Sequence, residues 1–283
     1  MDKGILNKIS ALNPTKSQKK IADFIIGNEK HAAYMTAAKL ASSVGVSEAT
    51  VVRFAVSLGY DGYPEFQKAL KTGTKKQLTA TERMEIASEK ISEKDIAKTV
   101  LKSDIEKLEK TIHELDYDNF NKATELILNA KHIYIAGVRS SAALASFAGF
   151  YLKLLFENTT VITGTGAEDI TEQLFHAGEG DVVLGISFPR YSSGTVKALS
   201  FAERRGADII ALTDSIESPI VKHSSCTLLA RSEMDSFADS LVAPMSILNA
   251  LIFAVGYRMG SKTKETFDEL ENIWRDYEVY DSE

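Results

Sequence analysis

Five short apolar runs alternate with helical stretches in the second half of the chain, and no other feature of the sequence restricts the fold as strongly. Each run is apolar at consecutive positions, so a strand formed there would need cover on both faces. Strands of that kind separated by helices predict a parallel sheet between two helical layers, which is an α/β domain. We expect the strands to be doubly wound in the flavodoxin-like order 2-1-3-4-5. The runs are residues 132–137, 159–164, 181–187, 207–214 and 224–230.

The first and third runs lead into serine-rich segments that open helices. In the order 2-1-3-4-5 the winding direction reverses between strands 1 and 3, and ligands of such sheets bind at that point, outside the carboxyl ends of the strands. Hydroxyls and free N–H groups at a helix N-terminus attract anions, so two such loops predict an anion site, although each loop alone could hold only N-capping serines. The candidate ligand-binding residues are Arg139, Ser140 and Ser141 after the first run and Ser187, Arg190, Ser192, Ser193 and Thr195 after the third.

Arg139 and Arg190 add two positive charges to these loops. Two guanidinium groups that face one pocket repel each other unless an anion lies between them, and each can bind a carboxylate or a phosphate through two hydrogen bonds. We therefore expect a ligand with a carboxylate, or with a second anionic group besides a phosphate. The alternative is that Arg190 pairs with Glu168 or Asp169 and only shapes its loop.

Residues 36–60 contain two apolar stripes with helical spacing, separated by a glycine turn. Gly45 permits a positive φ in the turn, and Ser47 stands where an N-cap is required. Two short amphipathic helices joined in this way predict a helix-turn-helix. The stripes consist of Ala37, Leu40, Ala41 and Val44, and of Val51, Phe54, Ala55 and Leu58.

The outer face of the second helix carries small and β-branched residues around one arginine, whereas a face meant only for water would carry Lys and Glu. Such a face suits the major groove of DNA, where Arg can bind guanine and apolar groups can touch thymine methyls. The alternative is a plain αα-hairpin whose outer valines, Val56 above all, pack on the next helix. The candidate DNA-binding residues are Ser47, Ala49, Thr50, Val52 and Arg53, with Lys19 and Lys20 of the preceding helix as phosphate contacts or as a solvated face.

Charge and length support a division of the chain into two domains. Residues 1–77 contain 12 Lys and Arg against 6 Asp and Glu, although the 283-residue chain has a net charge of −6. A basic module on an acidic body indicates binding to a phosphate backbone through one end. We expect a helix-turn-helix domain over 1–77, a linker with a dimerisation or docking helix over 78–115, and the α/β domain over 116–283.

Further helices are expected on both sides of the sheet region. The helix over 96–115 carries the stripe Val100, Ile105, Leu108, Ile112 and Leu115, which we expect to dock on the second domain or on a partner subunit. The helix over 239–260 is apolar nearly throughout and is expected to be buried, and the tail stripe from Phe267 to Tyr277 is expected to pack. The single cysteine, Cys226, excludes a disulfide framework and a Cys-based zinc site, and its apolar surroundings predict an inert thiol.

The chain resembles the RpiR-type transcriptional regulators, in which an N-terminal helix-turn-helix precedes a SIS (sugar isomerase) domain. The resemblance rests on VSEATVVRFAVSLGY at 46–60, on HIYIAGVRSS at 132–141 and on ISFPRYSSGT at 186–195. It implies a dimeric or tetrameric regulator of sugar catabolism whose SIS domain binds a phosphosugar or a related sugar acid. Ser141, Ser187 and the Ser192–Thr195 turn match the phosphate-binding residues of that domain, whereas Arg139 and Arg190 depart from the family pattern.

SIS domains also occur in aldose–ketose isomerases, which need a general base beside the sugar. Glu172 and His176 follow the second run, but we expect Glu172 to face solvent or to bind a sugar hydroxyl, and His176 to cap its helix. No metal-ligand spacing and no nucleophile–base pair is present, so we expect no catalytic residue, metal or cofactor. The prediction is therefore a cytoplasmic regulator, a repressor rather than an activator, that binds double-stranded DNA and no membrane. The alternative is a sugar-phosphate isomerase or lyase with an accessory helical domain.

Overall fold

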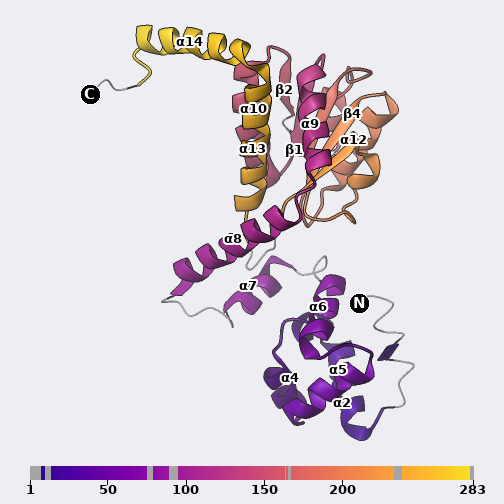
Figure 1. Ribbon diagram of the computed structural model, residues 1–283. Coiled ribbons are helices and arrows are strands. Elements are labelled where there is room, and N and C mark those ends of the chain that lie inside the picture. Colours follow the sequence, from indigo (N-terminus) through magenta and orange to yellow (C-terminus); the bar gives the residue numbers. More distant parts are fainter. Residues whose placement is uncertain are drawn as a thin grey trace. The chain divides into compact units, whose positions relative to one another are not determined.

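The computed structural model describes residues 8–9, 14–74, 79–88, 95–162, 164, 167–232 and 238–280 (Figure 1). The chain divides into two compact units between Lys94 and Asp95. The N-terminal unit is helical in its described part, and the second unit contains the sheet (Figure 1).

Helix-capping residues define the N-terminal unit. Thr15 and Gln18 form a reciprocal capping box at the start of α2, and Thr36 and Ser47 cap α4 and α5 through their hydroxyls. Gly45 ends α4 with φ +71°, a conformation that disfavours residues with a side chain. The predicted helix-turn-helix is therefore formed by α4 and α5. The helices are α2 (Lys16–Gly27), α3 (Glu29–Ala32), α4 (Ala37–Val44), α5 (Glu48–Ser57), α6 (Tyr63–Thr74) and α7 (Ala80–Ser88).

The core of this unit is built around two aromatic rings. Phe54 of α5 and Phe66 of α6 are fully buried and meet edge to face, with their ring centroids 6.0 Å apart. Tyr63 donates its hydroxyl proton to the Met35 carbonyl, and burial raises the pKa of Tyr63 to about 12. These contacts fasten α6 to the helix-turn-helix. Helix α7 lies inside the segment 78–115 that the sequence predicts to be a linker with one later helix.

The second unit contains a five-stranded parallel sheet in the order β2-β1-β3-β4-β5, as predicted. The strand ends of β1 and β3 are in register, with Gly137 beside Ile186. Alternate strand residues point to opposite faces, so one face packs against α9, α10 and α13 and the other against α11 and α12 (Figure 1). The strands are β1 (Ile133–Gly137), β2 (Thr159–Ile162), β3 (Val182–Ile186), β4 (Asp208–Thr213) and β5 (Cys226–Leu229).

The helices of this unit alternate with the strands. Their bounds are α8 (Ile96–His113), α9 (Tyr117–Asn129), α10 (Ser141–Leu155), α11 (Ala167–Gln173), α12 (Ser193–Arg204), the 3-10 helix η3 (Val221–His223), α13 (Val242–Met259) and α14 (Ser261–Asp276).

The apolar surfaces of two helices differ from the sequence-based expectation. Helix α13 is long and apolar enough to span a membrane, but it buries one side against α9 and α10 and leaves Tyr257 78% exposed, so the expectation of full burial is wrong. The tail stripe on α14 packs through Phe267, whereas Ile273 and Tyr277 are exposed. An apolar pattern identifies the hydrophobic residues of a helix, but a folded chain leaves a part of its hydrophobic surface exposed to solvent.

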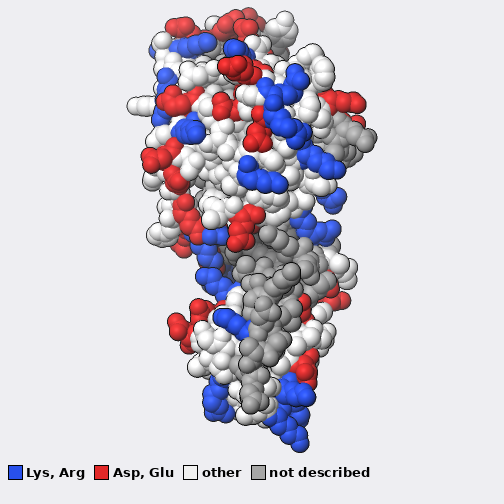
Figure 2. All heavy atoms as spheres, turned by 90° about the vertical axis from the view of Figure 1, so that its right-hand side faces the viewer, with Lys and Arg blue, Asp and Glu red and all other residues white. Residues whose placement is uncertain are grey.

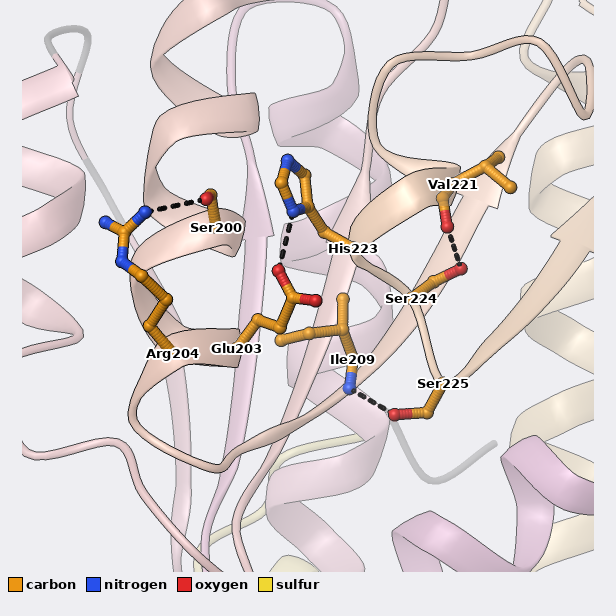
Figure 3. A network of polar contacts seen from close by, with 8 residues as sticks. All are labelled: Ser200, Glu203, Arg204, Ile209, Val221, His223, Ser224 and Ser225. Carbon is orange, nitrogen blue, oxygen red and sulfur yellow. Dashed lines mark hydrogen bonds and ion pairs between the residues drawn. The ribbon is translucent and has the colours of Figure 1, made fainter.

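The amino-end edge of the sheet is held by a polar network (Figure 3). The Nδ1 atom of His223 lies 2.6 Å from a carboxylate oxygen of Glu203 on α12. The hydroxyl of Ser225 accepts the N–H of Ile209. The same hydroxyl donates to a carboxylate oxygen of Asp208. Because α12 runs away from the carboxyl ends of the strands, this network anchors the sheet at the edge opposite the predicted ligand site.

The buried cysteine behaves as predicted. Cys226 begins β5 and is 3% exposed. Burial raises the pKa of its thiol to about 11, so the protonated form prevails at neutral pH.

Candidate functional site

The outer face of α5 is open to solvent. Val56 is 53% exposed and Val52 also lies on the surface, so the alternative in which these valines pack on α6 is wrong. Ala49 and Arg53 are exposed beside them. The structure thus leaves a face of small and β-branched residues around one arginine available to a partner.

Hydrogen bonds organise the polar residues of this face. Ser47 accepts the N–H of Thr50, and the two hydroxyl oxygens lie 2.8 Å apart. The Nη2 atom of Arg53 donates to the Thr50 hydroxyl over 3.2 Å. Ser47 is therefore occupied as the helix cap, and Thr50 steadies the arginine at the start of the helix.

Basic residues flank this face. Lys19 and Lys20 are exposed on α2, and the adjacent Gln18 donates from Nε2 to the hydroxyl of Ser57 at the end of α5. This hydrogen bond joins α2 to the end of α5 beside its outer face. Figure 2 shows Lys and Arg side chains gathered at the lower end of the N-terminal unit. Positive charge of this kind is attracted by the phosphate backbone of a nucleic acid.

The second candidate site lies where the winding of the sheet reverses. The β1–α10 and β3–α12 loops are neighbours because β1 pairs with β3, which confirms the topology on which the sequence-based prediction depends. The first loop is tight. A Cβ added at Gly137 would lie 2.7 Å from the Ser141 carbonyl oxygen, and Arg139 adopts φ +57°. The chain therefore reverses direction within a few residues of the strand end.

Three hydroxyl residues of these loops are buried. Ser141, Ser187 and Thr195 are each at most 5% exposed. Ser192 caps α12 by accepting the N–H of Thr195. Among the described residues the Oγ1 atom of Thr195 has no hydrogen-bond partner. Buried hydroxyls normally have one, so this atom is free to bind a ligand at the N-terminus of α12.

The remaining predicted residues lie at the surface of the same edge. Arg139, Ser140, Arg190 and Ser193 are exposed. No ion pair within the described part of the chain involves either arginine, and Asp169 forms none with Arg190. The side chain of Glu168 lies outside the described residues.

Glu172 lies on α11, on the β2 side of the loops. It lines an open hollow of about 430 Å³ together with Gly164, Asp169 and Gln173. Glu172 is exposed, and within the described part of the chain it forms no hydrogen bond with the serines of the two loops. His176 follows the end of α11 and is likewise exposed, with its ring edge-on to Phe175. In the described residues no group of three His, Cys, Asp or Glu side chains is placed to hold a metal ion.

Sequence reasoning missed the residues that position the second loop. The hydroxyl of Thr213 donates to the Ser187 carbonyl over 2.7 Å. The Tyr191 hydroxyl donates to Asp214, also over 2.7 Å, and burial with the nearby Asp214 carboxylate raises the Tyr191 pKa. Thr213 ends β4 and Asp214 directly follows it. Strand β4 is the neighbour of β3 in the predicted order, and that adjacency was the signal available for finding the two residues.

Comparisons with known proteins identify both units. The family described as "Helix-turn-helix domain, rpiR family" matches residues 3–77, and the SIS domain matches residues 126–254. An HTH-type transcriptional regulator of Clostridium perfringens is 28% identical over 273 residues, which are 94% of each chain. A second HTH-type transcriptional regulator, from Haemophilus influenzae, is 28% identical over 263 residues, or 89% of each chain.

Two solved structures are similar as well. The sugar isomerase domain of an RpiR transcription factor from Sphaerobacter thermophilus is 30% identical, with a TM-score of 0.60, over 63% of this chain and 99% of that one. The Vibrio vulnificus NanR protein complexed with ManNAc-6P is 20% identical, with a TM-score of 0.58, over 96% of this chain and 98% of that one. The chain belongs to the RpiR family of transcriptional regulators, with a helix-turn-helix that binds DNA and a SIS domain.

Proposed function

We propose that this regulator is a cytoplasmic repressor of carbohydrate catabolism genes whose operator affinity is set by a phosphosugar or sugar acid. The carrying observation is the unpartnered Oγ1 of Thr195, 1% exposed at the N-terminus of α12, together with the buried Ser141 and Ser187. A phosphate oxygen can accept from these hydroxyls and from the free N–H groups of the first turn. The proposed ligand residues are those of the two loops, with Glu172 to bind a sugar hydroxyl.

The DNA contact is assigned to α5. Its exposed residues Ala49, Val52 and Arg53 enter the major groove, with the adjoining Ser47 and Thr50 at the phosphates. Lys19 and Lys20 bind phosphates from α2. The proposed domain limits are 1–77 for this module, 78–115 for the connecting segment and 116–283 for the ligand domain.

We also propose that the regulator is a homodimer or homotetramer. Most of the predicted stripe of α8 is open to solvent, with Val100, Ile105 and Ile112 exposed, while Lys107 and Thr111 are buried. Leu115, which follows the helix, packs on the core of the unit. A second copy of the same helix would cover this aliphatic face. A symmetric pair places two recognition helices on two half-sites of an operator.

The ligand class can be tested by a thermal-shift screen of the full chain. The panel contains N-acetylmannosamine 6-phosphate, the ligand named for the NanR structure, with glucose 6-phosphate, 6-phosphogluconate and unphosphorylated gluconate. A ligand present at about 100 times its Kd stabilises the folded state by roughly 2.7 kcal/mol, so its melting transition moves upward. Each binder is expected to be recovered unchanged after incubation. Turnover that disappears in Glu172→Gln would instead favour an isomerase, and no shift with any phosphosugar or with gluconate would contradict the proposal.

A second prediction concerns the two arginines. If both guanidinium groups face the ligand, 6-phosphogluconate is expected to bind about tenfold more tightly than glucitol 6-phosphate, which has an alcohol in place of the carboxylate. Arg139→Ala and Arg190→Ala should each reduce that preference. Calorimetry with the two compounds measures it, and Arg204→Ala on the far part of α12 is the control. Equal binding of both compounds by the wild-type chain would contradict the prediction.

A further inference from the structure

A chain of hydrogen bonds begins at the first ligand loop. The hydroxyl of Ser140 donates to the Oδ2 atom of Asp239 over 2.7 Å, although the two residues are 99 positions apart. Ser140 directly precedes the buried Ser141. The carboxylate of Asp239 therefore lies at the rim of the proposed anion site, where a bound phosphate would repel it and compete for the same hydroxyl proton.

The residue after Asp239 continues the chain to α8. The hydroxyl of Ser240 donates to the Oδ1 atom of Asp104 over 2.6 Å. Asp104 lies 3.5 Å from the ammonium group of Lys107, and their side chains are only 17% and 4% exposed. Charges so poorly solvated depend on their partners, so Asp104 cannot lose a donor without a cost.

A second branch joins the same segment to α8. Arg231, which follows β5, donates its backbone N–H to the hydroxyl of Thr111 and pairs through its guanidinium with Glu114. Ser232 donates its hydroxyl to the Ser240 carbonyl over 2.9 Å and so connects the two branches. Both sides of the segment between β5 and α13 are therefore bonded to α8.

Helix α8 is also the first element after the boundary at Lys94, so the DNA-binding unit is joined to the ligand unit through it. We propose that Asp239 and Ser240 couple ligand binding to operator binding. Phosphosugar at Ser140 displaces the Asp239 carboxylate, Ser240 moves with it, and α8 loses its bond at Asp104. This inference rests on the proposed function, because it requires an anion at the Ser140–Ser141 turn.

The first test measures the hydrogen-exchange rates of the α8 amides in the absence of ligand and DNA. Asp239→Ala removes the acceptor of Ser140, and among the described residues no hydrogen bond joins Asp239 itself to α8. Hydrogen exchange of the α8 amides from 104 to 111 should nevertheless become about tenfold faster, the size of one lost bond to a charged group. Asp239→Asn keeps an acceptor and should restore the wild-type rate. Ser246→Ala removes a hydroxyl that donates to the Val242 carbonyl within α13, and it should leave the exchange of α8 unchanged. Wild-type exchange in Asp239→Ala would overturn the inference.

The second test measures coupling in the full chain. A duplex selected from a random library on the wild-type protein is titrated with and without N-acetylmannosamine 6-phosphate, and with 6-phosphogluconate as a second probe. Coupling of this kind is typically about 5–150-fold in affinity. In Ser240→Ala the ratio of the two operator affinities should fall to within about twofold of one, while affinity for the probe stays within about threefold of wild type.

The two tests separate the inference from the proposed function. If neither sugar phosphate binds the wild-type chain, the proposed function is contradicted for these two compounds. The hydrogen-exchange experiment then decides the inference by itself. If a probe binds and changes operator affinity equally in wild type and Ser240→Ala, the inference is wrong and the proposed function stands. Loss of coupling in Ser240→Ala but not in Ser246→Ala supports it.

Discussion

Phe54→Ala is expected to unfold the N-terminal unit and to leave the second unit folded. Phe54 is fully buried on the inner face of α5 against Phe66, and truncation of such a ring costs about 3–5 kcal/mol. The free energy of unfolding of a whole domain is only about 5–15 kcal/mol, so this loss is a large part of the stability of the N-terminal unit. Calorimetry should show the loss of one melting transition, and binding to all duplexes should fail.

The matched control is Phe150→Ala on α10. The same side chain is removed there from a position that is 61% exposed, so stability should change by no more than about 0.5 kcal/mol. Phosphosugar binding should survive in both variants. A Phe54→Ala chain with both transitions intact would contradict the core described for the N-terminal unit.

Arg53→Ala, one position along the same helix, should leave the fold intact and weaken binding to the selected operator by about 1–3 kcal/mol, which is roughly 5–150-fold. Arg53 is exposed and rests on Thr50, so its removal creates no cavity. The preference for one base at the contacted position should relax. Fluorescence anisotropy with operator variants measures both effects.

Two further substitutions show whether the loss concerns base recognition. Arg53→Lys keeps the positive charge but loses the bidentate hydrogen bond that a guanidinium group can form with guanine, so base preference should still relax. Lys20→Ala should weaken binding to every duplex alike and lower the salt dependence by about one phosphate contact. An Arg53→Ala chain with unchanged base preference would mean that α5 does not read the groove as proposed.

The sheet and the two loops could be predicted because their evidence is local. Runs that are apolar on both faces require a covered parallel sheet, and the reversal between β1 and β3 follows from its strand order. Ser187 directly follows β3, and Ser141 and Thr195 lie in the first turns of the helices after β1 and β3, so their nearness needs no knowledge of side-chain packing. Capping by Ser47 and the turn at Gly45 are equally local.

The contacts between distant segments could not be predicted. Asp239 reaches Ser140, and Ser240 reaches Asp104, across segments about a hundred residues or more apart, and no periodicity records such pairs. Helix α8 shows the same difficulty in another form. Its apolar stripe was expected to dock on the second domain or on a partner subunit, and nothing in that pattern indicated that Lys107 and Thr111 would be buried within the chain, where Asp104, Ser103 and the backbone of Arg231 satisfy their polar groups.

Because Cys226 is buried, a dye can be attached to this chain at an introduced cysteine without labelling the native one. With a pKa of about 11, only roughly one in ten thousand of its thiols is ionised at pH 7, whereas an exposed cysteine is ionised to a few per cent. A cysteine introduced on α5 or α8 should therefore react with a maleimide dye while Cys226 does not. Two dyes placed in this way would report the distance between the DNA-binding and ligand-binding units in solution, without removal of the native residue.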